Sequence, residues 1–414
     1  MTNISIIILL LVFILTAIRQ VGDIKLQIWQ VMLGGAIMVL LTGQITLKQA
    51  WTSINPDVMI FLFGMFVIGV ALEESGYLAH LSYQIFRRAR NGSQLLFQIL
   101  FFMGIASAFL MNDTIAIIGT PIMLQLAQKH RIDPKILLLT LAFSVTIGSV
   151  MSPIGNPQNL LIAIEGRLEN GFVTFFQYLL IPTLVNLGAA FFFIKYFSKK
   201  EFTDTPLNHI AEPIRERDLA HLSRISLLSL TGLIMVKIGM VMFKIPFDFK
   251  LIYIALLSAL PILLFSKKRR LILKKVDWHT LLFFAAMFVL MQSVWNTGFF
   301  QRMITSLNVN MISIQMILLV SVLLSQLISN VPLVALYLPM LTLLGASSKE
   351  LMTLAAGSTI AGNLFILGAA SNVIIIQNAE KRSGATLSFL EFSKIGIPLT
   401  LINLLVYLLF FIIF

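Results

Sequence analysis

The sequence predicts an all-α polytopic membrane protein made of two inverted repeats, each with five transmembrane spans, one re-entrant hairpin and one discontinuous helix. Composition is the first reason: 58% of the 414 residues are hydrophobic and only 12% are charged, whereas soluble domains carry about 25% charged residues. The second reason is a series of apolar stretches long enough to cross a bilayer. The third is a set of polar, helix-breaking clusters inside apolar blocks, because such backbone survives at membrane depth only where protein or a cavity surrounds it.

Composition also excludes several classes of function. The chain has no cysteine, so disulfides, thiolate metal sites and thiol catalysis are excluded. The net charge of +12 is explained by basic loops on the cytoplasmic side of a membrane, so no nucleic-acid partner is expected. The sequence has no Gly-x-x-x-x-Gly-Lys phosphate loop. An ion gradient is therefore the expected source of energy.

The expected spans form two groups separated by a polar linker. The first group is 4–18, 26–43, 58–72, 136–151 and 172–197, and the second is 225–243, 247–265, 281–294, 351–367 and 389–414. The run 4–18 has no basic residue before it and no small-residue cleavage site after it, so we interpret it as a first span rather than a signal peptide. The predicted boundaries are 1–197 for the first repeat, 198–223 for a cytoplasmic linker and 224–414 for the second repeat.

Each half has one further apolar block with a polar break in its middle. These blocks, 97–127 and 312–344, are each long enough for two half-length helices joined by a tight turn. Such a pair forms a re-entrant hairpin that enters and leaves the membrane on one side. Beside each block, a span at 136–163 or 351–379 is itself interrupted by Gly, Ser and Asn residues. Breaks of this kind next to hairpin tips predict a binding site near the membrane midplane.

Three landmarks recur in the same order in both halves. Met65-Phe66-Val67 returns as Met287-Phe288-Val289, an offset of 222 positions. Asn112 returns as Asn330, each nine residues before a Pro, with an offset of 218. Gly155 and Asn159 return as Gly368 and Asn372, with an offset of 213. Because each copy crosses the membrane an odd number of times, the second copy is inverted, which is a recurring design of secondary transporters.

The distribution of basic residues gives an independent prediction of topology. Of the 30 Lys and Arg residues, 23 fall in loops on one side of the predicted membrane, six fall on the other, and Lys237 lies inside a span. The side with more basic residues is predicted to be cytoplasmic. Both termini then lie outside, the first hairpin opens from the cytoplasm, and the second opens from the exterior.

Asp113, at the tip of the first hairpin, is the one acid predicted to lie deep in the hydrocarbon region. A carboxylate there is costly, and it usually carries a proton or coordinates a cation. The alternative is a helix cap, since Asn112, Asp113 and Thr114 can all satisfy free N–H groups where the second half-helix begins. The second tip, Ser329-Asn330-Val331-Pro332, has no acid. A proton or cation role is therefore expected to differ between the repeats.

The two broken spans offer backbone and side-chain ligands without any Lys or Arg. Gly and Pro free backbone carbonyls there, and opposed half-helix N-termini can bind an oxyanion. A kinked helix repaired by its neighbours is the alternative. The predicted substrate- and ion-binding residues are Asn112, Asp113, Thr114, Ser152, Gly155, Asn156, Asn159, Ser329, Asn330, Gly368, Ser371 and Asn372. Asp113 is the predicted coupling residue, and a sodium ion is expected at Asn112, Asp113, Ser329 and Asn330.

Other polar and aromatic residues are given structural interpretations. Lys237 is expected to snorkel along its span, and Glu73 and Glu74 are expected at the membrane interface. The five histidines, His279 among them, fall in loops or at interfaces with no metal-ligand spacing. The four tryptophans, Trp29 among them, are interpreted as interface anchors.

The chain resembles the ion transporter superfamily, which contains citrate-transporter-like permeases, arsenite efflux permeases, sodium/proton antiporters and divalent-anion:sodium symporters. The resemblance rests on Asn112-Asp113-Thr114, on the run from Ser152 to Asn159, and on Ser329-Asn330-Val331-Pro332. The first tip is most similar to the arsenite-permease and antiporter branch. Symporters carry Ser-Asn-Thr at both tips, and Met111, Asp113 and Val331 depart from that pattern. The resemblance implies a homodimer with a fixed scaffold and a moving transport domain that contains both hairpins.

The sequence therefore predicts a secondary active transporter, not an enzyme, in the cytoplasmic (inner) membrane. It is expected to move a small anion or arsenite by elevator-type alternating access, coupled to a proton or sodium gradient, with no cofactor and with the lipid bilayer as its surroundings. A sodium/proton antiporter with Asp113 as the exchange site is the nearest alternative. A passive channel needs a continuous polar stripe, and a membrane enzyme needs a nucleophile–base pair or a His cluster. Neither pattern is visible in the sequence.

Overall fold

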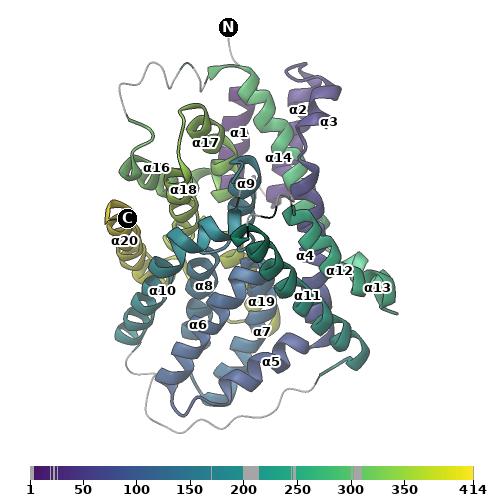
Figure 1. The fold of residues 1–414 in the computed structure, drawn as a ribbon. Coiled ribbons are helices and arrows are strands. Elements are labelled where there is room, and N and C mark those ends of the chain that lie inside the picture. Colours follow the sequence, from purple (N-terminus) through teal and green to yellow (C-terminus); the bar gives the residue numbers. More distant parts are fainter. Residues whose placement is uncertain are drawn as a thin grey trace.

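The computed structural model is an assembly of helices in which the two hairpins and the two broken spans meet near the centre (Figure 1). It describes residues 4–18, 20–21, 24–25, 27–168, 170–198, 214–243, 245, 249–299, 302 and 310–413. Most of the predicted linker 198–223 lies outside the described residues.

The first half contains ten helices and one pair of two-residue strands within the described ranges. They are α1 Ile4–Ile18, β1 Gln20–Val21, β2 Ile24–Lys25, α2 Ile28–Leu41, α3 Leu47–Ser53, α4 Pro56–Ser75, α5 Tyr77–Phe86, α6 Gly92–Leu110, α7 Asn112–His130, α8 Pro134–Ser149, α9 Pro157–Glu165 and α10 Gly171–Phe197. β1 and β2 are antiparallel. α6 and α7 form the first hairpin, and α8 and α9 are the two parts of the first broken span.

The second half is likewise helical within the described ranges. Its helices are α11 Arg217–Met242, α12 Leu251–Phe265, α13 Arg269–Lys275, α14 Trp278–Asn296, α16 Ile314–Ile328, α17 Asn330–Leu343, α18 Ser348–Ile360, α19 Ala370–Ser383 and α20 Phe389–Ile413. Two short 3-10 turns, η1 Ala361–Asn363 and η2 Ile366–Gly368, lie between α18 and α19. α16 and α17 form the second hairpin.

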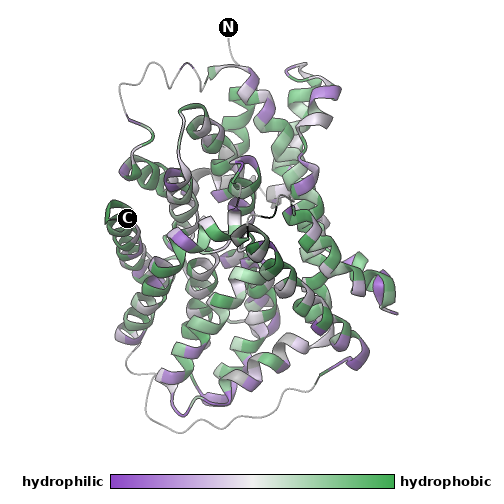
Figure 2. Cartoon of the chain, viewed as in Figure 1, coloured by the Kyte–Doolittle hydropathy of each residue, from purple (hydrophilic) through white to green (hydrophobic). Residues whose placement is uncertain are grey.

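The predicted all-α membrane fold is confirmed, apart from the short strand pair. Within the described ranges, six helices are long and apolar enough to cross a membrane, namely α4, α6, α10, α11, α14 and α20, and five shorter apolar helices accompany them. Apolar residues run along the helices in Figure 2, while polar residues gather near helix ends. The short helices α3, α5 and α13 were not predicted, because each is shorter than a span and carries polar residues throughout.

Capping residues followed by proline set several helix starts. Asn55, Asp133 and Asn156 each accept a hydrogen bond from the first turn of a helix whose first residue is Pro. Proline suits this position because it has no N–H to satisfy and its φ angle is already helical. The sequence therefore fixes the start of α4, α8 and α9, and α9 begins inside the bundle rather than at its edge.

Both hairpin tips turn on a residue other than glycine with a positive φ. Met111, between α6 and α7, has φ 67° and ψ 141°, and Ser329, between α16 and α17, has φ 71° and ψ 159°. This conformation is strained for any residue with a Cβ and costs about 1–3 kcal/mol. The two positions are 218 residues apart, the same offset that relates Asn112 to Asn330.

Glycine allows the first hairpin to approach its broken span backbone to backbone. A Cβ added to Gly148 of α8 would lie 2.1 Å from the carbonyl oxygen of Gly104 in α6. Because Gly104 presents backbone rather than a movable side chain at this point, no larger residue fits at position 148 without separating the two helices. The close contact fixes the position of the first tip relative to the break that follows α8.

The helices pack as two groups. In the scaffold group (α1, α2, α4 and α11–α14), α4 packs against α12 and α2 packs against α14. In the hairpin group (α6–α10 and α16–α20), α6 and α7 pack against α8, α16 and α17 pack against α18, and α10 packs against α20. In Figure 1 most of the scaffold group lies on the right, and the hairpin group lies at the left and centre.

Candidate functional site

The first hairpin tip is tied directly to the first break. The backbone N–H of Asn112 donates to the carbonyl oxygen of Gly155 at 2.8 Å. The side-chain oxygen of Asn112 accepts from the N–H of Asp113 at 2.9 Å. Asn112, the first residue of α7, therefore holds the tip in place and satisfies one N–H of the first turn, although no side chain caps the helix at Met111. The Asp113 side chain faces the cavity described below.

Asn159 satisfies the backbone that the first break leaves open. Its Nδ2 donates to the carbonyl oxygens of Ser149, Val150 and Ser152 at 3.1, 3.2 and 3.0 Å. Its backbone N–H donates to Oδ1 of Asn156 at 2.8 Å. All five of these residues, including Asn159 itself, are buried. They support the break from behind and do not line the cavity.

Thr359 of α18 joins the first break to the second half. Its hydroxyl accepts hydrogen bonds from Nδ2 of Asn156 at 3.2 Å and from Nε2 of Gln158 at 3.3 Å. It also donates to Oδ1 of Asn159 at 3.3 Å. Thr359 and Gln158 were not singled out from the sequence. Their role depends on contacts between residues about 200 positions apart, and no local pattern shows such contacts.

The second break is satisfied less completely. Nδ2 of Asn372 donates to the carbonyl oxygen of Gly362 at 2.7 Å, and Nε2 of Gln326 donates to that of Ala361 at 2.7 Å. Six buried oxygens in this region have no hydrogen-bond partner among the described residues. They are Oγ1 of Thr146, Oε1 of Gln326, Oδ1 of Asn330, Oδ1 of Asn363, Oγ of Ser371 and Oδ1 of Asn372. Buried polar atoms without a partner are uncommon and often mark a site for water or an ion.

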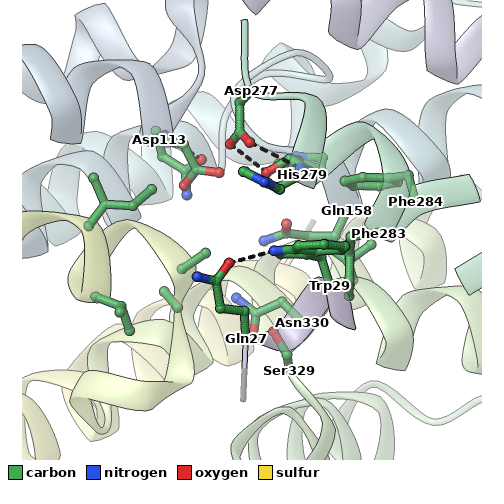
Figure 3. Close-up of a pocket in the computed structure, with 18 of the residues that line it drawn as sticks. Gln27, Trp29, Asp113, Gln158, Asp277, His279, Phe283, Phe284, Ser329 and Asn330 are labelled. Carbon is green, nitrogen blue, oxygen red and sulfur yellow. Dashed lines mark hydrogen bonds between the residues drawn. The ribbon is translucent and has the colours of Figure 1, made fainter. Parts of the chain in front are cut away.

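A cavity of about 700 Å³ lies between the hairpin group and the scaffold group (Figure 3). The hairpin group contributes both tips, the start of α9 and one face of α19. The scaffold group contributes the starts of α2 and α14. The lining residues are Gln27, Trp29, Asn112, Asp113, Pro157, Gln158, Asp277, His279, Thr280, Phe283, Phe284, Ser329, Asn330, Val331, Ala369, Ala370, Val373, Ile374 and Gln377. The four residues of the predicted sodium site thus surround one cavity.

The other predicted site residues lie behind the cavity wall. Thr114 packs against α4, where a Cβ added to Gly69 would lie 2.9 Å from its methyl group. Gly368, Ser371 and Asn372 are buried at the second break, and Gly368 lies close to the side-chain oxygen of Gln326. These residues can act on a ligand only through the backbone or through an ion held within the break.

The cavity is acidic. Among the described residues, its lining includes the carboxylates of Asp113 and Asp277, one imidazole from His279, and no Lys or Arg. Figure 3 shows Asp113 and Asp277 on the same side of the cavity, with their carboxylates pointing toward one another. No group of three or more His, Cys, Asp or Glu side chains suited to a metal ion occurs in the described ranges.

The scaffold wall contains side chains that the sequence did not point to. The ring of Trp29 stacks on that of His279 with centroids 4.8 Å apart, and its Nε1 donates to Oε1 of Gln27 at 2.5 Å. Asp277 caps α14 by accepting from the backbone N–H and the hydroxyl of Thr280. Trp29 and His279 were interpreted as interface residues, because their position at a helix start looks the same in sequence whether it faces lipid or a cavity.

Glu73 and Glu74 are ion-paired outside the cavity. A carboxylate oxygen of Glu74 lies 2.5 Å from Nζ of Lys275, and one of Glu73 lies 3.8 Å from a guanidinium nitrogen of Arg382. Lys237 donates to the carbonyl oxygen of Phe249, beyond the end of its own helix. None of the three residues lines the cavity.

These observations define a class of protein: a multi-pass helical membrane protein in which paired hairpin tips and broken helices surround a central cavity, as in secondary transporters. Comparison with known sequences gives the family. The family model described as "Citrate transporter" (CitMHS) matches residues 8–349, and the chain belongs to this family. The predicted membership of the ion transporter superfamily agrees with this result.

Several relatives and structural neighbours are named as transporters. The chain is 26% identical over 435 residues to the silicon efflux transporter LSI3 of Oryza sativa subsp. japonica, covering 89% of each protein. It is 29% identical over 398 residues to an uncharacterized transporter of Mycobacterium bovis, covering 90% of each. The Alcanivorax borkumensis YdaH transporter shares the fold with a TM-score of 0.56 at 16% identity, covering 99% of this chain and 97% of that one. The chain is therefore a membrane transporter and not an enzyme, and no catalytic cofactor is expected in this family.

Proposed function

We propose that this chain is a secondary active transporter of the cytoplasmic membrane that moves a small anion or arsenite, coupled to a proton or sodium gradient. The observation that carries the proposal is the cavity between both hairpin tips and the scaffold wall. Its volume of about 700 Å³ suits a small molecule, and its lining combines amides and two hydroxyls, those of Thr280 and Ser329, with aromatic and aliphatic side chains.

The charge of the cavity favours an uncharged substrate over a free anion. Two carboxylates, with no Lys or Arg in the described part of the lining, repel an ionised oxyanion unless a proton or cation neutralises them. The amides of Asn112, Gln158 and Asn330 can donate to and accept from the hydroxyl groups of a protonated oxyacid such as arsenite. Silicic acid is a second test substrate, since the rice relative is named a silicon efflux transporter.

The second break supports a coupling cation. The unpartnered oxygens of Thr146, Asn330 and Asn372 belong to three different elements, α8, the second tip and α19. Thr146 and Asn372 are both neighbours of Gly362: a Cβ there would lie 3.3 Å from the methyl group of Thr146, and Asn372 donates to its carbonyl oxygen. Unwound helices in transporters bind sodium or protons with such oxygens.

The inverted repeat gains support from α10 and α20. Thr183 and Asn186 of α10 are spaced like Thr400 and Asn403 of α20, at an offset of 217. Nδ2 of Asn403 donates to Oδ1 of Asn186 at 3.0 Å, and Nδ2 of Asn186 donates to the carbonyl oxygen of Asn403 at 3.4 Å. Equivalent residues meet in this way where a pseudo-two-fold axis passes between two repeats. If α2 is equivalent to α12 and α4 to α14, the same axis exchanges the α4–α12 contact with the α2–α14 contact, and both contacts are present.

Elevator-type alternating access is the motion that this arrangement favours. The cavity lies on the boundary between the hairpin group and the scaffold group, so a shift of one group along the other moves both tips together. With the predicted topology, α2 and α14 begin on the cytoplasmic side, and we infer from this that the structure represents an inward-open state. A homodimer, as the superfamily resemblance implies, would hold the scaffold group still while the hairpin group moves.

A sodium/proton antiporter is the second candidate, and the facing carboxylates of Asp113 and Asp277 favour it. Both candidates are tested by one experiment with purified protein in proteoliposomes. Fluxes of arsenite, silicic acid, sulfate, a dicarboxylate and sodium are compared with and without a pH gradient. Transport of a neutral oxyacid driven by either ion gradient supports the first proposal, while sodium–proton exchange with no solute flux supports the second. The mass of the detergent-solubilised protein tests the dimer.

A further inference from the structure

One hydrogen bond joins the scaffold group to the hairpin group at the end of the bundle predicted to face outside. Nδ2 of Asn55, at the start of α4, donates to Oε1 of Glu165, the last residue of α9, at 2.5 Å. The orientation of the Asn55 amide is fixed by its second role. Its Oδ1 accepts from the backbone N–H groups of Asp57 and Val58 at 2.9 and 3.2 Å as the cap of α4. The amide nitrogen is thereby directed away from α4 and toward Glu165.

The offsets between the two halves assign a counterpart to each partner. The offset of 222 that relates Met65 to Met287 takes Asn55 to Asp277, which caps α14 just as Asn55 caps α4. The offset of 213 that relates Asn159 to Asn372 takes Glu165 to Asn378 of α19. Each pair, Asn55 with Glu165 and Asp277 with Asn378, therefore contains one amide and one carboxylate. Their places are exchanged, because the scaffold supplies the amide in the first pair and the carboxylate in the second.

The second pair is not formed in this structure. Asp277 accepts its hydrogen bonds from Thr280 and lines the cavity. Across the cavity, Gln377 of α19, the residue before Asn378, belongs to the opposite wall. No hydrogen bond joins Asp277 and Asn378, two residues that the structure describes. The predicted topology puts Asn55 and Glu165 at the outer ends of their helices, Asp277 at the cytoplasmic start of α14, and Asn378 in the cytoplasmic half of α19, which ends at Ser383.

We propose that the two pairs are alternating contacts: Asn55 with Glu165 closes the outer route in the inward-open state, and Asp277 with Asn378 closes the inner route in the outward-open state. The inference rests on the proposed alternating access. As the hairpin group moves outward along the scaffold, Glu165 separates from Asn55, and Asn378 approaches Asp277. Each contact is a charge-assisted hydrogen bond, and each is present in one state only.

The test measures from which side the cavity can be labelled. Because the chain has no cysteine, a single Ala370→Cys change gives a reporter in the exposed lining of the cavity. A membrane-impermeant maleimide is applied to inside-out and right-side-out vesicles. Asn55→Asp preserves the α4 cap but sets two carboxylates against one another, and it is expected to shift labelling toward the outside by about tenfold. That factor corresponds to a charge-assisted hydrogen bond of about 1.4 kcal/mol.

A second variant is expected to act in the opposite direction. Asn378→Asp sets a carboxylate against Asp277 in the outward-open state only, so labelling shifts toward the inside. Adding Glu165→Gln to Asn55→Asp rebuilds the outer pair with the partners exchanged, as in the second half, and restores the wild-type ratio. Asn91→Asp is the matched control, since Asn91 also caps a helix, through the N–H of Gln94 at 2.9 Å, and bonds to no described residue of the scaffold group.

Solute flux measured in the same vesicles separates the two proposals. If solute is transported but Asn55→Asp and Asn378→Asp shift labelling in the same direction, or no more than Asn91→Asp does, the alternating contacts are overturned and the transport function stands. If the variants shift labelling oppositely and the exchanged pair restores it, the contacts stand. In that case the absence of any solute flux overturns only the proposed substrates.

Discussion

The two breaks are built from equivalent residues but differ in how their polar atoms are satisfied. In the first break, the amides of Asn156 and Gln158 both bond to Thr359. The equivalent positions in the second break, at the offset of 213, are Ala369 and Ser371, whose side chains are too short to reach the equivalent Thr146. Two substitutions thus convert a closed hydrogen-bond network into a group of unpartnered oxygens. The comparison favours a structural role for the first break, and it agrees with the proposal that a coupling ion binds at the second.

The largest expected effect concerns the relation between the halves, because an inverted repeat predicts an all-or-none difference in labelling. Ser93, near the start of α6, and Ser347, before α18, are replaced in turn by Cys in the cysteine-free chain. The thiol at 93 should react only from the cytoplasm and the thiol at 347 only from the exterior. If both thiols react from the same side, the two halves are not inverted copies. The residues of the two breaks could then not be treated as equivalent.

Asp113 marks the strongest functional difference between the two tips, since the second tip has no acid. Asp113→Asn keeps the size and hydrogen-bonding ability of the side chain but removes its titration. We expect uphill transport to be abolished and the pH dependence of flux to become flat, while downhill exchange persists. Flux in proteoliposomes between pH 5.5 and 8.5 (a range of about 3 units around the neutral region) measures both effects. Unchanged uphill transport would reduce Asp113 to part of the tip's cap.

Stability should separate Asn159 from its equivalent, Asn372. Asn159→Ala removes three hydrogen bonds to buried carbonyls, and we expect a loss of about 3 kcal/mol. Asn372→Ala removes one such bond and should cost about 1 kcal/mol, but it should also raise the concentration of the coupling ion needed for half-maximal flux. Thermal unfolding in detergent and ion titrations measure the two effects. Equal losses of stability would contradict the difference between the breaks.

A smaller effect is expected at the two ends of the scaffold. Trp29 stacks on His279 in the cavity wall, whereas the corresponding outer end carries an ion pair between Lys250 and Asp57 at 3.6 Å. Trp29→Ala should raise the KM for substrate about fivefold, since a stacked aromatic pair contributes about 1 kcal/mol. Trp278→Ala is the control, because Trp278 bonds to the carbonyl of Leu273 and lies outside the cavity. Equal KM changes would remove Trp29 from the substrate site.

The sequence predicted the hairpin group better than the scaffold wall. The polar clusters around Asn112, Asn159, Asn330 and Asn372 interrupt apolar blocks, and lipid allows such interruptions only where protein or a cavity surrounds them. The same argument gave the two tips and the two broken helices, which the structure contains. It did not give the depth of each residue, so the sequence did not separate residues that line the cavity, such as Asp113, from residues that support it, such as Asn159.

The residues on the scaffold side of the cavity form no comparable pattern in the sequence. Trp29, Asp277 and His279 stand at the starts of α2 and α14, where aromatic, acidic and polar residues are common for reasons of capping and interface anchoring alone. Only the packing of α2 against α14 brings them together beside the tips. The repeated Thr-x-x-Asn of α10 and α20 could have been read from the sequence as a further landmark at the offset of 217. It was missed because both copies lie inside continuous helices.

The strained residues at the hairpin tips bear on how this protein would respond to engineering. Met111 and Ser329 adopt backbone angles that glycine tolerates far better. Introducing glycine at either position relieves strain in the folded state but increases the freedom of the unfolded chain, so the net gain in melting temperature is small. A tip with glycine is also more flexible, so it would hold the neighbouring Asn112 or Asn330 less rigidly toward a solute in the cavity. A thermostable variant is therefore better sought at the lipid-facing helices than at these two turns.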